Sequence, residues 1–386
     1  MQKFAKRLSL LKPSESMAMA QKAKELQKTM DIIDLTLGQP DFDTPEHIKQ
    51  AAWRAIRDGK NSYTVSYGIP ELREAIAFFY KQYYCARYAP LKEVLVCPGA
   101  KQGIMYLMQA FLSPGDEVVL FEPCWLSYAD MIFLNEGVPR FIPALENMAP
   151  NLNQLESVIT SKTKMILINN PVNPSGYVFS QKELAYIVEI AKKHDLLIVS
   201  DEIYDRIVFT EFHSLSQFEQ ARDRSIVVGG FSKNYAMTGW RIAYILAAEE
   251  MISKIGLIHQ HTATCASSVS QYAALSAITD DQSCVNIMCR IYRERRDLLI
   301  SLLTSSKFKA IMPEGTFYLM LDCAGVGRNA ATPAEFLFNQ FGIASVDGIF
   351  YGTSSAEYAR LSLTCSENVL RKAAARLCGH EEKASL

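Results

Sequence analysis

Short apolar runs alternate with helical patterns through the middle of the chain, and this alternation limits the possible folds more than any other feature. The runs are EVLVCPG (93–99), DEVVLFEP (116–123), KMILINN (164–170), LLIVSDEIY (196–204) and SIVVGGFSK (225–233). Between the first two, Ile104, Leu107, Met108 and Phe111 share one helical face. Strands that are apolar on both faces and separated by amphipathic helices are typical of a parallel sheet. We therefore predict an α/β domain with a largely parallel sheet.

The last hundred residues have a different pattern. A long charged helix, CRIYRERRDLLISLL (289–303), precedes the runs GTFYLMLDC, FGIASVDG and YARLSLT, which are mixed with two more helices. This order suits a smaller α+β domain. We predict an N-terminal arm with part of the small domain over residues 1–45, a large domain over 46–280 and the small domain over 281–386. The sequence does not decide on which domain the arm packs.

Composition narrows the classes of protein that this chain can be. The 386 residues include 40 basic and 41 acidic side chains, so no basic surface for nucleic acid is expected. No apolar run reaches transmembrane length, and the start, MQKFAKRLSLLKPSE, lacks the apolar core of a secretory signal. Nine cysteines without a CxxC pair suit a reducing compartment. We therefore expect a cytoplasmic protein that binds neither nucleic acid nor membranes.

Three polar side chains follow the strongest apolar runs: Asn173, Asp201 and Lys233. Ligands of an open parallel sheet bind beyond the carboxyl ends of the strands, so we expect these side chains to meet in one crevice. A lysine near an acid is what pyridoxal phosphate (PLP) requires, because the lysine forms a Schiff base with the aldehyde and the acid keeps the pyridine nitrogen protonated. Other interpretations stay open, since Lys233 could be a solvated loop residue and Asp201 a helix cap or a metal ligand.

Several motifs in one order connect the chain to a known family. SDEIY, NPVNPSG and FSKNYAMTGWRIAY resemble signatures of the fold-type I, class I PLP-dependent aminotransferases, as do LGQPDFDTP, YGIPELREAI, PGDEVVLFEP and PEGTFY. The resemblance runs from about residue 8 to residue 375. It implies a large domain with a mostly parallel central sheet, a smaller α+β domain and PLP as the cofactor.

The resemblance assigns roles around the cofactor ring. Lys233 would be the Schiff-base lysine and later the acid-base group, and Asp201 would pair with the pyridine nitrogen. Tyr204 and Asn173 would hydrogen-bond the phenolic oxygen and lower the pKa of the internal imine. Trp125, in EPCWLSY, would stack on the ring, although a core aromatic is the alternative.

The resemblance also implies a phosphate site and a shared active site. PGAKQG opens a helix, so the amides of Ala100 and Lys101 would point at the phosphate. Ser232 and Arg241 would add a hydroxyl and a bidentate guanidinium. Tyr63 would reach the phosphate of a neighbouring subunit, which implies a homodimer with shared sites.

Substrate recognition is implied by the same comparison. Arg360, in YARLSL, would bind the α-carboxylate with help from the backbone of Gly38, and Asn173 and Trp125 would contact the substrate as well. The shorter bacterial branch of aspartate aminotransferases binds the distal carboxylate with residues that match Ser14, Ser16 and Lys101. The alternative is that Lys101 is solvated and that Ser14 caps a helix. For Arg360 the alternative is a surface charge, which is common for a lone arginine in a last strand.

Departures from the family pattern bear on specificity. Asp347 replaces a usual proline, Ala266 and Ser267 replace a proline and an acid, and Ala243 replaces a glycine. The first three lie in segments expected to line the substrate side. His259 and His261, in HQH, have no further spaced ligands, so we predict an exposed face and no metal site.

We therefore predict an aminotransferase that moves an amino group between an L-amino acid and a 2-oxo acid in ping-pong order. Aspartate or glutamate is the preferred donor, followed by aromatic or neutral amino acids. The alternative enzyme keeps the cofactor residues but diverts the substrate carbanion to elimination, cyclisation or oxidation in a biosynthetic pathway. A non-enzymatic scaffold protein is a third class, although it would not need Lys233, Asp201 and Arg360 together.

Overall fold

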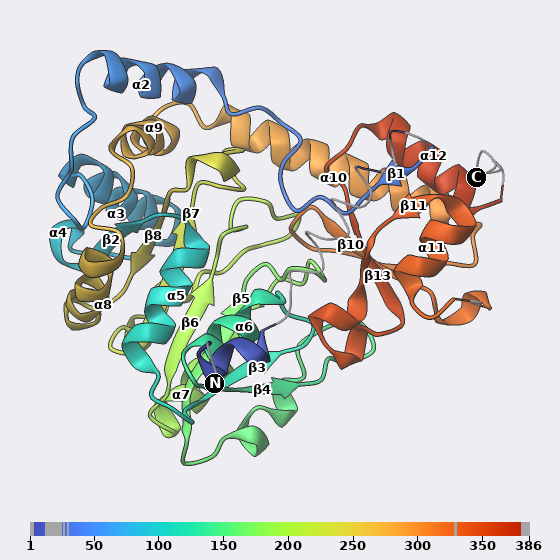
Figure 1. The fold of residues 1–386 in the computed structure, drawn as a ribbon, viewed down its shortest axis with the longest axis horizontal. Helices are drawn as coiled ribbons and strands as arrows, with labels where there is room; N and C mark the ends of the chain where they lie inside the picture. The colour runs from blue at the N-terminus through green and yellow to red at the C-terminus, as the bar shows by residue number, and fades with distance from the viewer. Residues whose placement is uncertain (1–3, 12–24, 26–27, 29–30, 328–329, 380–386) are drawn as a thin grey trace.

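A computed structural model describes residues 4–11, 25, 28, 31–327 and 330–379 (Figure 1). Its centre is a seven-stranded sheet in the order β2-β8-β7-β6-β5-β3-β4. These strands are β2 (Val94–Cys97), β3 (Glu117–Phe121), β4 (Val138–Ile142), β5 (Thr163–Asn169), β6 (Leu197–Asp201), β7 (Ser225–Gly230) and β8 (Ala243–Leu246). Only β8 runs antiparallel to its neighbours in this sheet, so the prediction of a largely parallel α/β sheet is confirmed.

Helices cover both faces of this sheet. Alternate residues of β2 enter different cores, because Val94 and Val96 pack into one cluster and Leu95 and Cys97 into the other. The first cluster is closed by α2 (Glu46–Arg57), α3 (Pro70–Tyr84), α7 (Gln181–Lys193) and α9 (Ser268–Thr279), and the second by α5 (Ala100–Phe111), α6 (Ser127–Leu134) and α8 (Glu249–Thr262). Burial on both faces explains why the strands lack polar alternation.

A second body follows along the chain, shown in orange and red in Figure 1. Its antiparallel sheet has the order β12-β13-β10-β9, with β9 (Lys309–Ile311), β10 (Tyr318–Asp322), β12 (Val346–Asp347) and β13 (Tyr358–Ser362). The long α10 (Ser283–Leu303), α11 (Pro333–Phe341) and α12 (Glu367–Leu377) accompany it, and the short α4 (Pro90–Glu93) precedes β2 in the large body. The predicted smaller α+β domain is therefore confirmed as a class, while its boundaries stay predictions.

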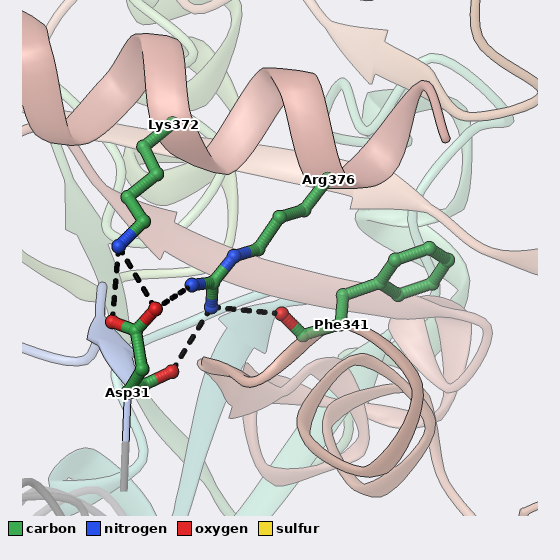
Figure 2. Close-up of polar contacts among 4 residues, drawn as sticks. All are labelled: Asp31, Phe341, Lys372 and Arg376. Carbon is green, nitrogen blue, oxygen red and sulfur yellow. Dashed lines mark hydrogen bonds and ion pairs between the residues drawn. The ribbon is translucent and has the colours of Figure 1, made fainter. Parts of the chain in front are cut away.

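The part of the N-terminal arm from Asp31 to Asp34 packs on this second body, whereas Lys6–Leu10 contacts α6 of the large body. Strand β1 (Ile33–Asp34) pairs in parallel with β11 (Ile343–Ala344). Figure 2 shows Asp31 between Lys372 and Arg376 of α12; the Lys372 ammonium lies 2.9 Å from the Asp31 carboxylate. Arg376 pairs with the same carboxylate and also donates to the carbonyl of Phe341 at 3.2 Å. These contacts join the arm to the C-terminal helix.

The predicted exposed face of HQH is correct for His261 but wrong for His259. His259 on α8 is buried rather than exposed, because its ring nitrogens contact the Ser66 carbonyl at 2.9 Å and the Tyr106 hydroxyl at 3.3 Å. Arg295 in the charged run of α10 is also buried, and its guanidinium forms a 2.8 Å ion pair with Asp41 of the arm. Each buried polar group therefore has a specific partner.

The described residues contain neither a membrane-spanning helix nor a metal-binding cluster. None of the helices in the described ranges combines the length and apolar surface needed to cross a bilayer. The same ranges contain no cluster of three or more His, Cys, Asp or Glu side chains suited to a metal ion.

Candidate active site

Asp201 is the last residue of β6 and lies at the carboxyl end of the parallel strands. Its carboxylate accepts a hydrogen bond from the Tyr128 hydroxyl at 2.7 Å and one from the Ile203 amide at 3.3 Å. Burial raises the pKa of Asp201 to about 6, although these two donors and the charge of Lys233 act in the opposite direction. The carboxylate is therefore held in a dry site where a cationic partner would stabilise it.

Lys233 lies three residues after β7 and shares this edge of the sheet. Its ammonium donates to the Gly38 carbonyl at 2.5 Å. Burial, followed by repulsion from Arg360 and Arg241, lowers the pKa of Lys233 to about 8, while Asp201 raises it. An amine that loses its proton this close to neutral pH is prepared for nucleophilic attack on a carbonyl carbon.

The loop that carries Lys233 is tied to the loop after β6. Asn234 donates to the Asp205 carboxylate at 2.5 Å, and the Tyr84 hydroxyl of α3 donates to the same carboxylate at 2.6 Å. Asp205 and Asn234 are both buried. These bonds fix the spacing between the segments that carry Asp201 and Lys233.

An anion site lies at the start of α5. Gly99 precedes the helix with φ 90°, and the Arg241 guanidinium lies so close that a Cβ on Gly99 would come within 2.4 Å of it. Arg241 itself has φ 51° and donates to the Thr238 carbonyl at 3.0 Å. The free amides of Ala100 and Lys101, the helix dipole and this guanidinium together favour an anion such as phosphate.

Ser232 and Trp125 lie between the two segments of this anion site in the sequence. Ser232 is buried directly before Lys233. Trp125 is half-buried, contacts Tyr128 edge-to-face at 5.3 Å between ring centroids, and lies 4.7 Å from the Lys101 ammonium. Desolvation and then the charge of Arg241 lower the pKa of Lys101. Lys101 is therefore a second cation beside the site.

Arg360 on β13 is a buried cation whose hydrogen-bond partners among the described residues are neutral oxygens and not carboxylates. Its guanidinium donates to the Thr36 carbonyl at 2.9 Å and to the side-chain oxygen of Asn173 at 3.3 Å. The rings of Tyr318 and Tyr351 lie 4.3 and 5.3 Å from the guanidinium carbon. A buried charge without a counterion is costly, so this position favours an anionic ligand.

Tyr204 and Asn173 connect the two sides of the site. The Tyr204 hydroxyl lies 3.3 Å from the Tyr318 hydroxyl, and burial raises the pKa of Tyr204 well above its ordinary value. The Asn173 amide is held by Asn169, the last residue of β5, at 2.8 Å. Tyr318 also lies against Gly38, where an added Cβ would come within 3.2 Å of its hydroxyl.

Some predicted residues lie elsewhere or outside the described residues. Tyr63 is 86% exposed, in the loop between α2 and α3, and is not part of this cluster. Ser14 and Ser16 lie outside the described residues. The carboxylate of Asp347 accepts from the Ala334 amide of α11 at 2.7 Å, and Ser267 caps α9.

Sequence reasoning missed Tyr128, Tyr318 and Tyr351. Tyr128 stands three residues after Trp125 at the start of α6, and Tyr318 ends the motif PEGTFY. Tyr128 and Tyr318 occur in motifs that match the family. The sequence does not show, however, that the Tyr128 hydroxyl contacts Asp201 or that the Tyr318 hydroxyl contacts Tyr204.

The arrangement fits PLP. The Lys233 amine could react with the aldehyde, and the Asp201 carboxylate could pair with the protonated pyridine nitrogen. The start of α5 and Arg241 could bind the phosphate. Gly99 leaves the space for this anion site, because any side chain there would collide with the guanidinium.

Comparisons with known proteins agree with this geometry. Residues 30–377 match the family model described as aminotransferase class I and II. The aspartate/prephenate aminotransferase of Thermus thermophilus is 37% identical over 97% of this chain and 98% of its own length. The asparagine–oxo-acid transaminase of Streptococcus mutans is 37% identical over 99% of this chain and all of its own. A structure of Thermus thermophilus aspartate aminotransferase with maleate superimposes with a TM-score of 0.93 at 36% identity, covering 99% and 100% of the two chains.

Proposed function

Because the chain belongs to the class I and II aminotransferases, which use PLP, we propose that Asp201 and Lys233 hold this cofactor and that aspartate or glutamate is the amino donor. The observation that carries the cofactor assignment is the pairing of a buried carboxylate with a low-pKa lysine at the carboxyl ends of neighbouring strands. When bound, PLP supplies the aldehyde that captures the amino group and the ring that accepts electrons from the substrate carbon.

The chain's own residues then have separate tasks. Lys233 anchors the aldehyde and afterwards carries a proton at its Nζ between the substrate carbon and the cofactor. Asp201 stabilises the protonated ring nitrogen, while Tyr204 and Asn173 lie where they can hydrogen-bond the phenolic oxygen. Trp125 would cover the ring, and Ser232 and Arg241 would join the amides of Ala100 and Lys101 around the phosphate.

Two cations support a dicarboxylate substrate. Arg360, buried and without a counterion, would bind the α-carboxylate, next to the backbone of Gly38. Lys101 would bind the distal carboxylate, together with Ser14 and Ser16 of the arm. The names of relatives in Thermus thermophilus mention aspartate and prephenate, and the Streptococcus mutans relative is named for asparagine. We place aspartate and glutamate first because both cations would then be neutralised.

Absorbance of the purified PLP-bound protein tests this function. Aspartate or glutamate alone should convert the bound cofactor to its amino form, and 2-oxoglutarate should restore the original spectrum. Neutral amino acids of similar size are the control for the distal carboxylate. Repeated turnover of an amino acid without any 2-oxo acid would instead indicate elimination, cyclisation or oxidation.

We also propose a homodimer in which Tyr63 reaches the neighbouring phosphate. Support comes from its 86% exposure in a single chain, which leaves its ring without packing partners of its own. Mixing inactive Lys233→Ala and Tyr63→Ala proteins tests this, because one site of a mixed dimer would carry neither change. Activity that does not recover after subunit exchange would argue against the shared site.

We also propose a cytoplasmic location, because nine free thiols suit a reducing compartment.

A further inference from the structure

Two buried donors, one on Arg360 and one on Tyr351, have no acceptor among the described residues. The Nε of Arg360 and the hydroxyl of Tyr351 are buried and make no hydrogen bond within the part of the chain that the structure describes. The residues are 3% and 1% exposed, and the Tyr351 ring centroid lies 5.3 Å from the guanidinium carbon. Buried donors normally have a hydrogen-bond partner, so two unpaired donors on residues in contact indicate that a ligand supplies an acceptor beside this guanidinium.

The chemistry of the missing acceptor follows from the groups that face it. It must accept from an N–H and an O–H, and it must neutralise a guanidinium that has no carboxylate partner in the described ranges. A carboxylate meets all three requirements. We propose that the Tyr351 hydroxyl donates a hydrogen bond to the same substrate carboxylate that Arg360 binds. This inference rests on the proposed function, in which Arg360 binds the α-carboxylate.

The backbone holds Tyr351 in place independently of its hydroxyl. Its carbonyl accepts from the Cys124 amide at 2.9 Å, one residue before Trp125. The next turn is fixed by Glu122, whose carboxylate accepts from Thr353 at 3.1 Å and from the Ser354 hydroxyl at 2.6 Å. These contacts join the loop to the end of β3. Replacing Tyr351 with phenylalanine therefore removes one donor and leaves the loop and the ring where they are.

Tyr318 is not equivalent to Tyr351, although its ring contacts the same guanidinium. Its hydroxyl already has a neighbour, the Tyr204 hydroxyl at 3.3 Å. Tyr351 is therefore the tyrosine of this pair whose hydroxyl has no engagement within the described residues.

The test uses the PLP-bound protein and succinate, a dicarboxylate that has no amino group to transfer. Calorimetric titration should show that Tyr351→Phe weakens succinate binding by about ten-fold, the effect of one hydrogen bond to a charged group. The KM for the amino acid should rise to a similar extent while kcat changes little, because the bond is present in both the ground and transition states. The melting temperature should stay equal or rise, since the deleted hydroxyl has no partner in the protein.

Two further variants separate the possible outcomes. Tyr80→Phe is the matched control, because the Tyr80 hydroxyl is also buried but belongs to α3 in the core of the large body, and its loss should leave succinate binding unchanged. Arg360→Gln should abolish succinate binding if Arg360 is the carboxylate site. If Arg360→Gln abolishes binding and Tyr351→Phe binds like the parent, the role of Tyr351 is refuted while the proposed function stands. If Arg360→Gln binds normally, the carboxylate site of the proposed function is itself refuted.

Discussion

The Tyr128 hydroxyl donates a 2.7 Å hydrogen bond to the Asp201 carboxylate, which is otherwise buried at the end of β6. The bond favours the ionised carboxylate, whereas burial raises its pKa to about 6 from an ordinary value of 3.8. Because the folded pKa is the higher one, ionising Asp201 costs the apoprotein stability as the pH rises through this range. A bound pyridinium reverses this effect by pairing with the carboxylate.

The pH dependence of PLP binding follows from this pair. As the pH falls through about 6, Asp201 becomes protonated and PLP affinity should decrease. In Tyr128→Phe the carboxylate loses a donor, so the decrease should begin at higher pH, with roughly ten-fold weaker binding at pH 6. Titration of apoprotein with PLP at several pH values, followed by fluorescence, measures this. Identical pH profiles for the variant and the parent would show that Tyr128 does not tune Asp201.

Lys233→Ala should retain PLP but lose turnover. The contacts of Asp201, Arg241 and the start of α5 remain, so the cofactor should stay bound without a covalent link. Loss of the acid-base amine should lower kcat by at least about 10³-fold, since such groups contribute 10²–10⁴-fold and the covalent step is lost as well. Lys164→Ala, at an exposed position of β5, is the control. A kcat in the Lys233 variant within about ten-fold of the parent value would refute the assignment.

Gly99→Ala should disrupt the phosphate site. An added Cβ would come within 2.4 Å of the Arg241 guanidinium, and the φ of 90° is unfavourable for any other residue. Gly115→Ala separates these effects, because its φ is 87° and no atom lies within 4 Å of the added Cβ. Both variants should lose about 1–2 kcal/mol of stability from backbone strain, but only Gly99→Ala should lose PLP affinity. Dialysis followed by absorbance of the retained cofactor distinguishes the two.

Asp31→Asn should loosen the N-terminal arm. Arg376 is 1% exposed and would keep its charge without a carboxylate partner. We expect a loss of about 1–2 kcal/mol in unfolding free energy, less than for a fully buried pair because Asp31 is partly exposed. Lys372→Ala, which leaves the Asp31–Arg376 pair intact, should cost under about 1 kcal/mol.

The acid dependence of this pair provides a second measurement. The hydrogen bond from Lys372 and the charge of Arg376 lower the pKa of Asp31 below 3.8. The stabilisation is therefore present above the ordinary carboxyl pKa and is lost as the pH falls through the lowered value. The difference between the parent and Asp31→Asn in chemical denaturation should shrink in acid. A constant difference down to pH 2 would contradict this account.

The sequence could predict much of the central sheet, since β5, β6 and β7 are apolar on both faces and each is followed within a few residues by a polar side chain. It did not predict β4, whose residues Val138–Ile142 are mostly exposed at the sheet edge and include a proline and an arginine. The antiparallel direction of β8 was also missed, because the composition of a strand does not indicate its direction.

The cofactor residues were predictable from motifs, whereas their hydroxyl partners were not. A tyrosine in a core and a tyrosine that donates to a ligand have the same sequence signature. Tyr128 and Tyr351 became distinguishable only when the distance to Asp201 and the missing acceptor near Arg360 were known. The role proposed for Tyr63 requires a second chain, so a single protomer places its ring in solvent.

The pairing of β1 with β11 joins Ile33 to Ile343, near opposite ends of the chain. During synthesis the arm leaves the ribosome first, but its partner strand is made only after all seven strands of the central sheet have emerged. The large body can therefore assemble while the arm still lacks its strand partner. The order of translation therefore makes Arg360 on β13 available later than Asp201 and Lys233, which the large body supplies.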